Sequence, residues 1–240
     1  GVVLKKAVDA SKDQSYVLFG MGQAQLSRTL MPVGAYPKSE IRKMAEDAGL
    51  LIAAKPDSQD ICFITSGDYK SFLKHRLTTT PGDIVELDGT VVGRHEGIEY
   101  FTIGQRRGLG LAEVDRRFVV RIEPTSKRVV VGPESALMRD EMFVSDVKYP
   151  LGITPDGPVE VNVKIRYKSS EAAAVLHPNG TSATIRFIRP QRSVTPGQAA
   201  VFFQGDVLLG GGIIEPSVDS LEGNISELGQ LTADQPTATL

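Results

Sequence analysis

The hydrophobic and polar positions near the start of the chain follow a helical period. After Pro37, apolar side chains recur at the 3.6-residue spacing of an amphipathic helix, at Ile41, Met44, Ala45 and Ala48. Gly49 stands where a glycine commonly terminates a helix. We predict a helix here, with one face packed on a core. A second helix is expected from a cap at Ser66 or Asp68 to about Arg76.

From Pro81 onward, short apolar segments alternate with turns, which is the pattern of a β protein. Two hairpins are predicted, from residues 84–87 with 90–92 and from residues 118–122 with 127–131. From Val159 to Arg166 apolar and polar residues alternate strictly, which predicts a half-buried strand. Further strands are predicted at residues 181–188, 198–203 and 207–214. Regular short strands of this kind indicate a small antiparallel barrel.

These patterns divide the chain into four parts. Residues 1–77 have a mixed α/β pattern, with a polar turn at residues 11–16 before an apolar segment at residues 17–19 that predicts a strand. Residues 78–140 form a small, mostly β central domain, and residues 141–216 form the barrel. Residues 217–240 contain few large apolar side chains and are predicted to be a disordered tail.

Composition restricts the function classes. Apolar content of 41% and charged content of 23% are those of a globular chain, and no apolar run approaches the roughly 20 residues of a membrane span. A net charge of −2 excludes a global basic field, so nucleic-acid binding would need a local patch. The single cysteine, with no disulfide framework, fits a reducing, cytoplasmic compartment. The three histidines lack metal-ligand spacing, and we expect no metal site.

Cys62 is that single cysteine, and it lies where polar, turn-forming residues lead into an apolar segment. A lone cysteine is most often a buried small apolar residue. The other interpretation is a reactive thiol, a nucleophile or a sulfur carrier, reachable from one side.

Three local patches could contact RNA. Lys164 and Arg166 share the polar face of the predicted strand, Tyr167 and Lys168 follow, and only Glu171 offsets their charge in the sequence. A solvated basic face and an RNA-stacking site are both compatible with this pattern. Residues 104–110 form a glycine-rich turn with two arginines, and they match neither the Walker nor the dinucleotide pattern. Similarly, residues 11–16 are either a plain polar turn or a phosphate and base contact.

Several blocks taken together resemble the tRNA-specific 2-thiouridylase family, and the resemblance covers residues 1–216. In chain order they are Lys12-Asp13-Gln14-Ser15-Tyr16, Asp60-Ile61-Cys62-Phe63-Ile64, Pro81-Gly82, Gly93-Arg94-His95-Glu96-Gly97, Tyr100-Phe101-Thr102-Ile103-Gly104-Gln105-Arg106-Arg107-Gly108-Leu109-Gly110 and Arg166-Tyr167. Each block alone is weak evidence, and their order and spacing make the resemblance specific.

The resemblance implies a fold and an activity. The fold is the α/β remnant of an ATP-pyrophosphatase domain, a small central domain and a C-terminal antiparallel β-barrel. The activity is ATP-dependent adenylation of the wobble uridine of certain tRNAs, with Mg²⁺ expected beside the ATP, followed by sulfur delivery from a persulfide on Cys62. The partners implied are tRNA and a persulfide relay protein, with a monomer expected. The tRNA contacts implied are Lys12, Asp13, Gln14, Arg166, Tyr167 and Gln198.

The chain departs from the family pattern in three respects, one of which is that Arg116-Arg117 replaces an aromatic pair often found near Phe118. The family's Ser-Gly-Gly-Val-Asp-Ser loop for ATP and its second cysteine are absent, and both are expected upstream of Gly1. The chain is therefore expected to be the C-terminal two-thirds of such an enzyme and inactive alone. Two alternatives stay open: a catalytically silent RNA-binding barrel module, and a β-barrel interaction domain that does not bind RNA.

Overall fold

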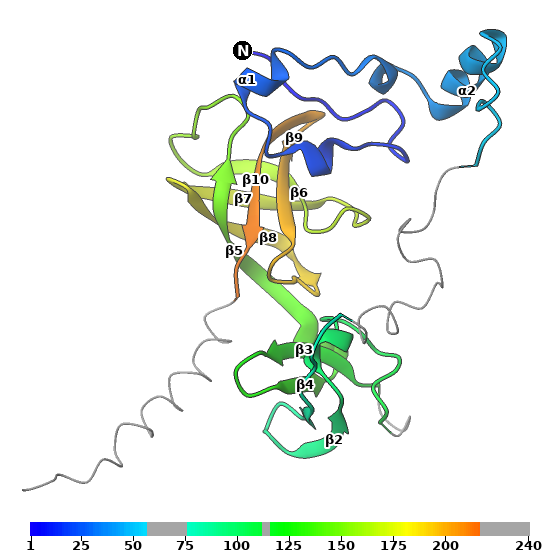
Figure 1. The fold of residues 1–240 in the computed structure, drawn as a ribbon. Helices are drawn as coiled ribbons and strands as arrows, with labels where there is room; N and C mark the ends of the chain where they lie inside the picture. Colours follow the sequence, from blue (N-terminus) through cyan, green and yellow to red (C-terminus); the bar gives the residue numbers. More distant parts are fainter. Residues whose placement is uncertain (57–75, 112–115, 217–240) are drawn as a thin grey trace, which may run out of the picture.

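The computed structural model describes residues 1–56, 76–111 and 116–216 (Figure 1). Cys62, the predicted second helix up to residue 75 and the predicted tail lie outside these residues. The described chain contains a closed barrel, a four-stranded sheet beneath it and an N-terminal segment that crosses the barrel at its other end (Figure 1). The long strand β5 (Met138–Lys148) runs from the sheet into the barrel. It crosses the position where we placed the boundary, and the domain limits stay a prediction.

The barrel is closed and antiparallel, in the order β10-β5-β8-β7-β6-β9. Its other strands are β6 (Val159–Lys164), β7 (Ala172–Asn179), β8 (Ser182–Arg192), β9 (Ala199–Gln204) and β10 (Val207–Ile214). The predicted barrel is thus confirmed, and its turns include Gly180 and Gly205 at positive φ, where a residue without a Cβ is favoured. β7 is not among the predicted strands, because its opening alanines give little β signal.

Alternating side chains fill the barrel interior. On β6, Val161 and Val163 point inward and are buried, as the alternation predicted. On β9 the burial is continuous instead, because both faces of this strand are covered. Phe202 belongs to the interior core, whereas Phe203 packs outside with residues of the N-terminal segment. The outer face of β9 and β10 is therefore a docking surface for that segment.

The central sheet has the order β2-β1-β4-β3. Its strands are β1 (Gly82–Val85), β2 (Val91–His95), β3 (Phe118–Glu123) and β4 (Arg128–Gly132). Both predicted hairpins are confirmed as antiparallel pairs, and β1 and β4 join them in parallel. Side chains bury both faces, with Val119 in one cluster and Phe118 and Val120 in another. Two short 3-10 helices, η3 (Ile98–Tyr100) and η4 (Glu134–Leu137), complete this region.

The N-terminal segment is helical and irregular. It contains η1 (Ser15–Leu18), α1 (Gln23–Leu26), η2 (Pro32–Ala35) and α2 (Lys38–Asp47). The strand predicted at residues 17–19 is wrong, since η1 occupies that position. Its apolar side chains are needed against the barrel rather than in a sheet, because Leu18 and Phe19 pack on the outer face of β9 and β10. Gly211 permits this approach, since a Cβ there would lie 2.7 Å from the Phe19 ring.

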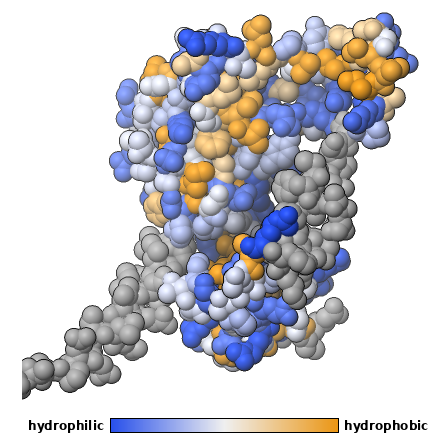
Figure 2. Space-filling view, viewed as in Figure 1, coloured by the Kyte–Doolittle hydropathy of each residue, from blue (hydrophilic) through white to orange (hydrophobic). Residues whose placement is uncertain are grey.

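The helix predicted after Pro37 is confirmed as α2, and Gly49 has the positive φ of a glycine that terminates a helix. Its predicted packing on a core is not found: α2 has no buried residue within the described chain. Apolar side chains gather on the surface in this region (Figure 2), among them Leu51 and Ile52, which are 101% and 70% exposed. None of the described helices is both long and apolar enough to cross a membrane.

Candidate functional site

The N-terminal segment joins the barrel through backbone pairing at the start of β10. Leu208 N donates to Leu4 O over 2.9 Å, and Lys6 N donates to Asp206 O over 2.8 Å. Lys5 forms an isolated antiparallel bridge with Val207. This short stretch of pairing fixes the register of residues 4–6 against the start of β10. The turn that follows in the N-terminal segment therefore begins from a fixed position on the barrel.

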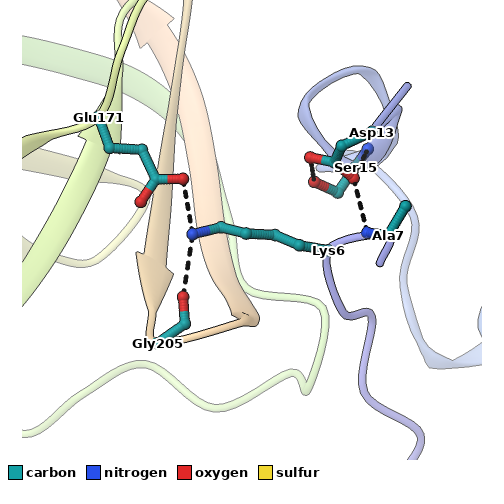
Figure 3. A network of polar contacts seen from close by, with 6 residues as sticks. All are labelled: Lys6, Ala7, Asp13, Ser15, Glu171 and Gly205. Atoms are coloured by element: carbon teal, nitrogen blue, oxygen red, sulfur yellow. Dashed lines mark hydrogen bonds and ion pairs between the residues drawn. The ribbon is translucent and has the colours of Figure 1, made fainter. Parts of the chain in front are cut away.

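The Lys6 side chain reinforces this joint, and its ammonium lies between Glu171 and Gly205 (Figure 3). Its ammonium forms an ion pair with Glu171 at 2.6 Å, donates to Gly205 O at 2.9 Å and lies 4.4 Å from the Phe203 ring centroid. The two charged side chains are only 22% and 28% exposed. Solvent screening is therefore weaker here than for a surface pair, and the contact contributes more to docking.

We expect Lys6→Met to loosen this joint by about 1–2 kcal/mol, because a charged hydrogen bond and its ion pair are lost while the aliphatic stem is kept. Amide hydrogen exchange at Lys6 and Leu208 should then accelerate by about tenfold. Lys5→Met is the matched control, since the Lys5–Asp206 pair is 58% and 61% exposed and should contribute little. Equal acceleration in both variants would contradict a special role for Lys6.

Asp13 organises the turn that follows. One carboxylate oxygen accepts from Ala7 N at 3.0 Å and Ser15 N at 3.2 Å, and the other accepts from Ser15 Oγ at 2.7 Å (Figure 3). These bonds hold Lys12 and Gln14, which are both exposed, on either side of the turn. The geometry supports a positioning role for Asp13, and its direct contact with tRNA stays a prediction.

The turn brings Gln14 against the barrel. Gln14 Nε2 donates to Tyr167 Oη over 2.5 Å, a contact between residues that are 153 positions apart in sequence. Next to it, the rings of Tyr16 and Tyr167 lie with centroids 6.0 Å apart and planes tilted by 60°. Lys164 Nζ lies 6.0 Å from the Tyr16 ring and 5.8 Å from the Tyr167 ring. We call Gln14, Tyr16, Lys164 and Tyr167 the tyrosine–lysine cluster.

Tyr16 is the buried floor of this cluster. Its hydroxyl donates to Ala199 O over 2.8 Å, which also places it beside Gln198, exposed in the turn before β9. Burial raises the pKa of the Tyr16 phenol, against the opposing field of Arg166. The phenol therefore stays protonated at neutral pH and keeps its hydrogen bond. The buried Tyr16 ring therefore lies against Tyr167, within the field of Arg166, and its hydroxyl is bonded to the residue that follows Gln198.

Three cations at or beside the cluster have no carboxylate partner in the part of the chain that the structure describes. Among the described residues, no ion pair is formed by Lys164, Arg166 or Lys168. Sequence alone assigned Glu171 to offset these charges, and the structure corrects this, because Glu171 pairs with Lys6. The positive charge of this surface is thus available to an anionic partner.

The glycine-rich turn at residues 104–110 has the predicted character. Arg106 and Arg107 are exposed, and neither guanidinium has a partner among the described residues. Gln105 braces the turn by accepting from Thr102 N and donating to Arg107 O, both at 3.0 Å. The turn touches the barrel, since a Cβ on Gly104 would lie 2.5 Å from Ser193 Oγ.

Sequence reasoning found the edge of the cluster and missed its centre. Tyr16 was grouped with the polar turn, and Lys164 was assigned to a basic face that could contact RNA, without a link to Tyr16. No local signal marks Tyr16 as the floor, because its partner Ala199 is distant in sequence. The predicted catalytic residue Cys62 lies outside the described residues.

Comparison with known proteins gives matches along the whole described chain. The tRNA methyl transferase HUP domain matches residues 1–66, the tRNA methyl transferase PRC-barrel domain matches residues 70–133, and the aminomethyltransferase β-barrel domain matches residues 139–214. The chain is 45% identical to the tRNA-specific 2-thiouridylase of Pelotomaculum thermopropionicum over 219 residues, 90% of this chain and 60% of the relative. It is also 45% identical to that of Rhodospirillum centenum over 225 residues, 89% of this chain and 57% of the relative.

The fold and these matches place the chain in a class of proteins built from a HUP domain and two β domains. Within that class, the chain belongs to the tRNA-specific 2-thiouridylase family. This confirms the resemblance and the predicted fold class. The chain spans 57% to 60% of the length of these relatives.

Proposed function

We propose that this chain binds tRNA and delivers sulfur in a tRNA 2-thiouridylase that modifies the wobble uridine of certain tRNAs. The observation that carries this proposal is the tyrosine–lysine cluster with its uncompensated cations, in a chain whose relatives are named as tRNA-specific 2-thiouridylases. Aromatic rings beside cations are how unpaired RNA is commonly held. The tRNA contacts proposed are Lys12, Asp13, Gln14, Arg166, Tyr167 and Gln198, with Asp13 acting by positioning its neighbours.

The chemistry proposed proceeds in three displacements. The uridine O2 attacks the α-phosphorus of ATP and releases pyrophosphate, with Mg²⁺ neutralising phosphate charge. The terminal sulfur of a Cys62 persulfide then attacks C2, and AMP leaves with O2. A second cysteine thiolate attacks Cys62 Sγ, which breaks the S–S bond, forms a disulfide and leaves the sulfur on C2. No residue of this chain is assigned to ATP, and a persulfide relay protein is the proposed sulfur source.

The test uses a chimera in which the amino-terminal segment of the Pelotomaculum thermopropionicum relative precedes Gly1. With tRNA, ATP and a persulfide donor, nucleoside mass spectrometry should detect 2-thiouridine, and omitting ATP should abolish it. Binding of tRNA without thiolation would favour the silent RNA-binding module instead. Absence of both would reject the proposed function.

A further inference from the structure

Lys164 has an unusual environment for a lysine on a barrel surface. It is half-buried at the end of β6, and its ammonium is bounded by the rings of Tyr16 and Tyr167. Each contact at about 6 Å is weakly attractive. Together the rings restrict where the ammonium can lie, which reduces the side-chain entropy lost when it binds a further group.

The group best suited to bind the Lys164 ammonium is an anion. No carboxylate among the described residues pairs with it, and Glu171, which follows it in the sequence, is held by Lys6. Arg166 raises the local positive potential, as its effect on the pKa of Tyr16 shows. A half-buried ammonium with no oxygen partner among the described residues would gain most from a charged acceptor.

We propose that Lys164 binds a backbone phosphate of the RNA, and that Tyr16 and Tyr167 hold its ammonium in place for that contact. This deepens the proposed function and rests on it. Gln14 and Tyr16 come from the N-terminal segment and Lys164 and Tyr167 from the barrel, so the phosphate site forms only where the two are docked. The contact positions the RNA on this joint and does not read its sequence.

A phosphate contact has a distinct experimental signature. Each lysine that neutralises a phosphate releases counterions from the RNA. Its loss therefore makes the negative slope of log K against log salt concentration shallower by about 0.7 to 0.9. The loss is uniform across RNA sequences, whereas loss of a base contact depends on sequence and leaves the slope nearly unchanged.

The experiment measures binding of the chain to a tRNA transcript and to an unrelated transcript of equal length over a salt series. Lys164→Gln should make the negative slope shallower by about 0.7 to 0.9 for both RNAs. Lys164→Arg should keep the slope of the unsubstituted chain, because the charge is kept. Lys148→Gln is the matched control. It removes the same charge from an exposed lysine on β5, which lies across the barrel from β6 in the strand order, and should leave the slope unchanged.

The outcomes separate the proposal from the function on which it rests. A sequence-dependent loss with an unchanged slope would overturn the phosphate assignment, and so would equal slopes in the Lys164→Gln and unsubstituted chains. Failure of the unsubstituted chain to bind tRNA would instead reject the proposed function. Thermal unfolding checks that Lys164→Gln stays folded, and an equal melting temperature is expected because no hydrogen bond of Lys164 is lost.

Discussion

The Cys62→Ser chimera is expected to form no 2-thiouridine, a fall in rate of at least about a thousandfold. A hydroxyl cannot carry a persulfide, so the sulfur has no covalent route from the donor to the uridine. Cys62 is the single cysteine of this chain, and no second thiol within it can substitute. The measurement is nucleoside mass spectrometry of tRNA after single turnover.

Two further measurements separate a sulfur carrier from a packing residue. In the Cys62→Ser chimera, tRNA affinity and ATP-dependent release of pyrophosphate should both persist, because adenylation precedes sulfur transfer. Continued 2-thiouridine formation would show that Cys62 is not the carrier. Loss of tRNA affinity together with thiolation would show that the residue supports the fold instead, as a buried cysteine does.

The reactivity of Cys62 should depend on how its charge is balanced. A thiol with the ordinary pKa near 8.5 is only a few per cent ionised at neutral pH, whereas a persulfide is more acidic. Asp57 and Asp60 flank the residue in sequence and disfavour an anion there, so Lys55 or the cationic side chains of the tRNA site must offset them. Sulfur transfer from the persulfide therefore needs no strong base.

The sequence predicted the strands well because their patterns are local. Alternation from Val159 to Ile165 marked β6, and Gly180 and Gly205 marked the turns that the barrel closes through. The same reasoning failed at residues 17–19, where an apolar run packs on another element rather than in a sheet. Periodicity identifies an apolar face and does not identify what covers it.

The candidate site was only partly predictable for a related reason. The turn around Asp13 is a local arrangement, since an aspartate that accepts from Ser15 two residues on is a common turn. The pairing of Lys6 with Glu171 joins residues that are far apart, and proximity in sequence assigned Glu171 to the wrong cations. Long-range charge pairs follow from chain topology, which composition and spacing do not contain.

Substitutions at two adjacent residues of β9 can separate two effects: loss of docking of the N-terminal segment and loss of stability of the barrel. Phe202 and Phe203 are both fully buried, but they point to opposite sides of the strand. We expect Phe202→Ala to destabilise the barrel by about 3–5 kcal/mol, because a large side chain is removed from a closed interior. That is a large fraction of the stability of a typical domain, so we expect the melting temperature to fall strongly.

Phe203→Ala should have a different result. The cavity opens at the docking surface, so the N-terminal segment is released while the barrel stays closed. Exchange at the Lys6 and Leu208 amides should accelerate, and exchange at Val163 should not. Release also removes Tyr16 from Lys164, so tRNA affinity should fall together with its salt dependence.

Phe143→Ala is the control for both variants, since Phe143 lies on β5 and is 37% exposed. Its loss should change neither exchange at the joint nor tRNA affinity. If Phe203→Ala and Phe202→Ala unfold the chain alike, the joint and the barrel are one cooperative unit, and the RNA site cannot be opened separately. If Phe203→Ala alone lowers tRNA affinity in a folded barrel, docking of the N-terminal segment is what completes the tRNA-binding surface.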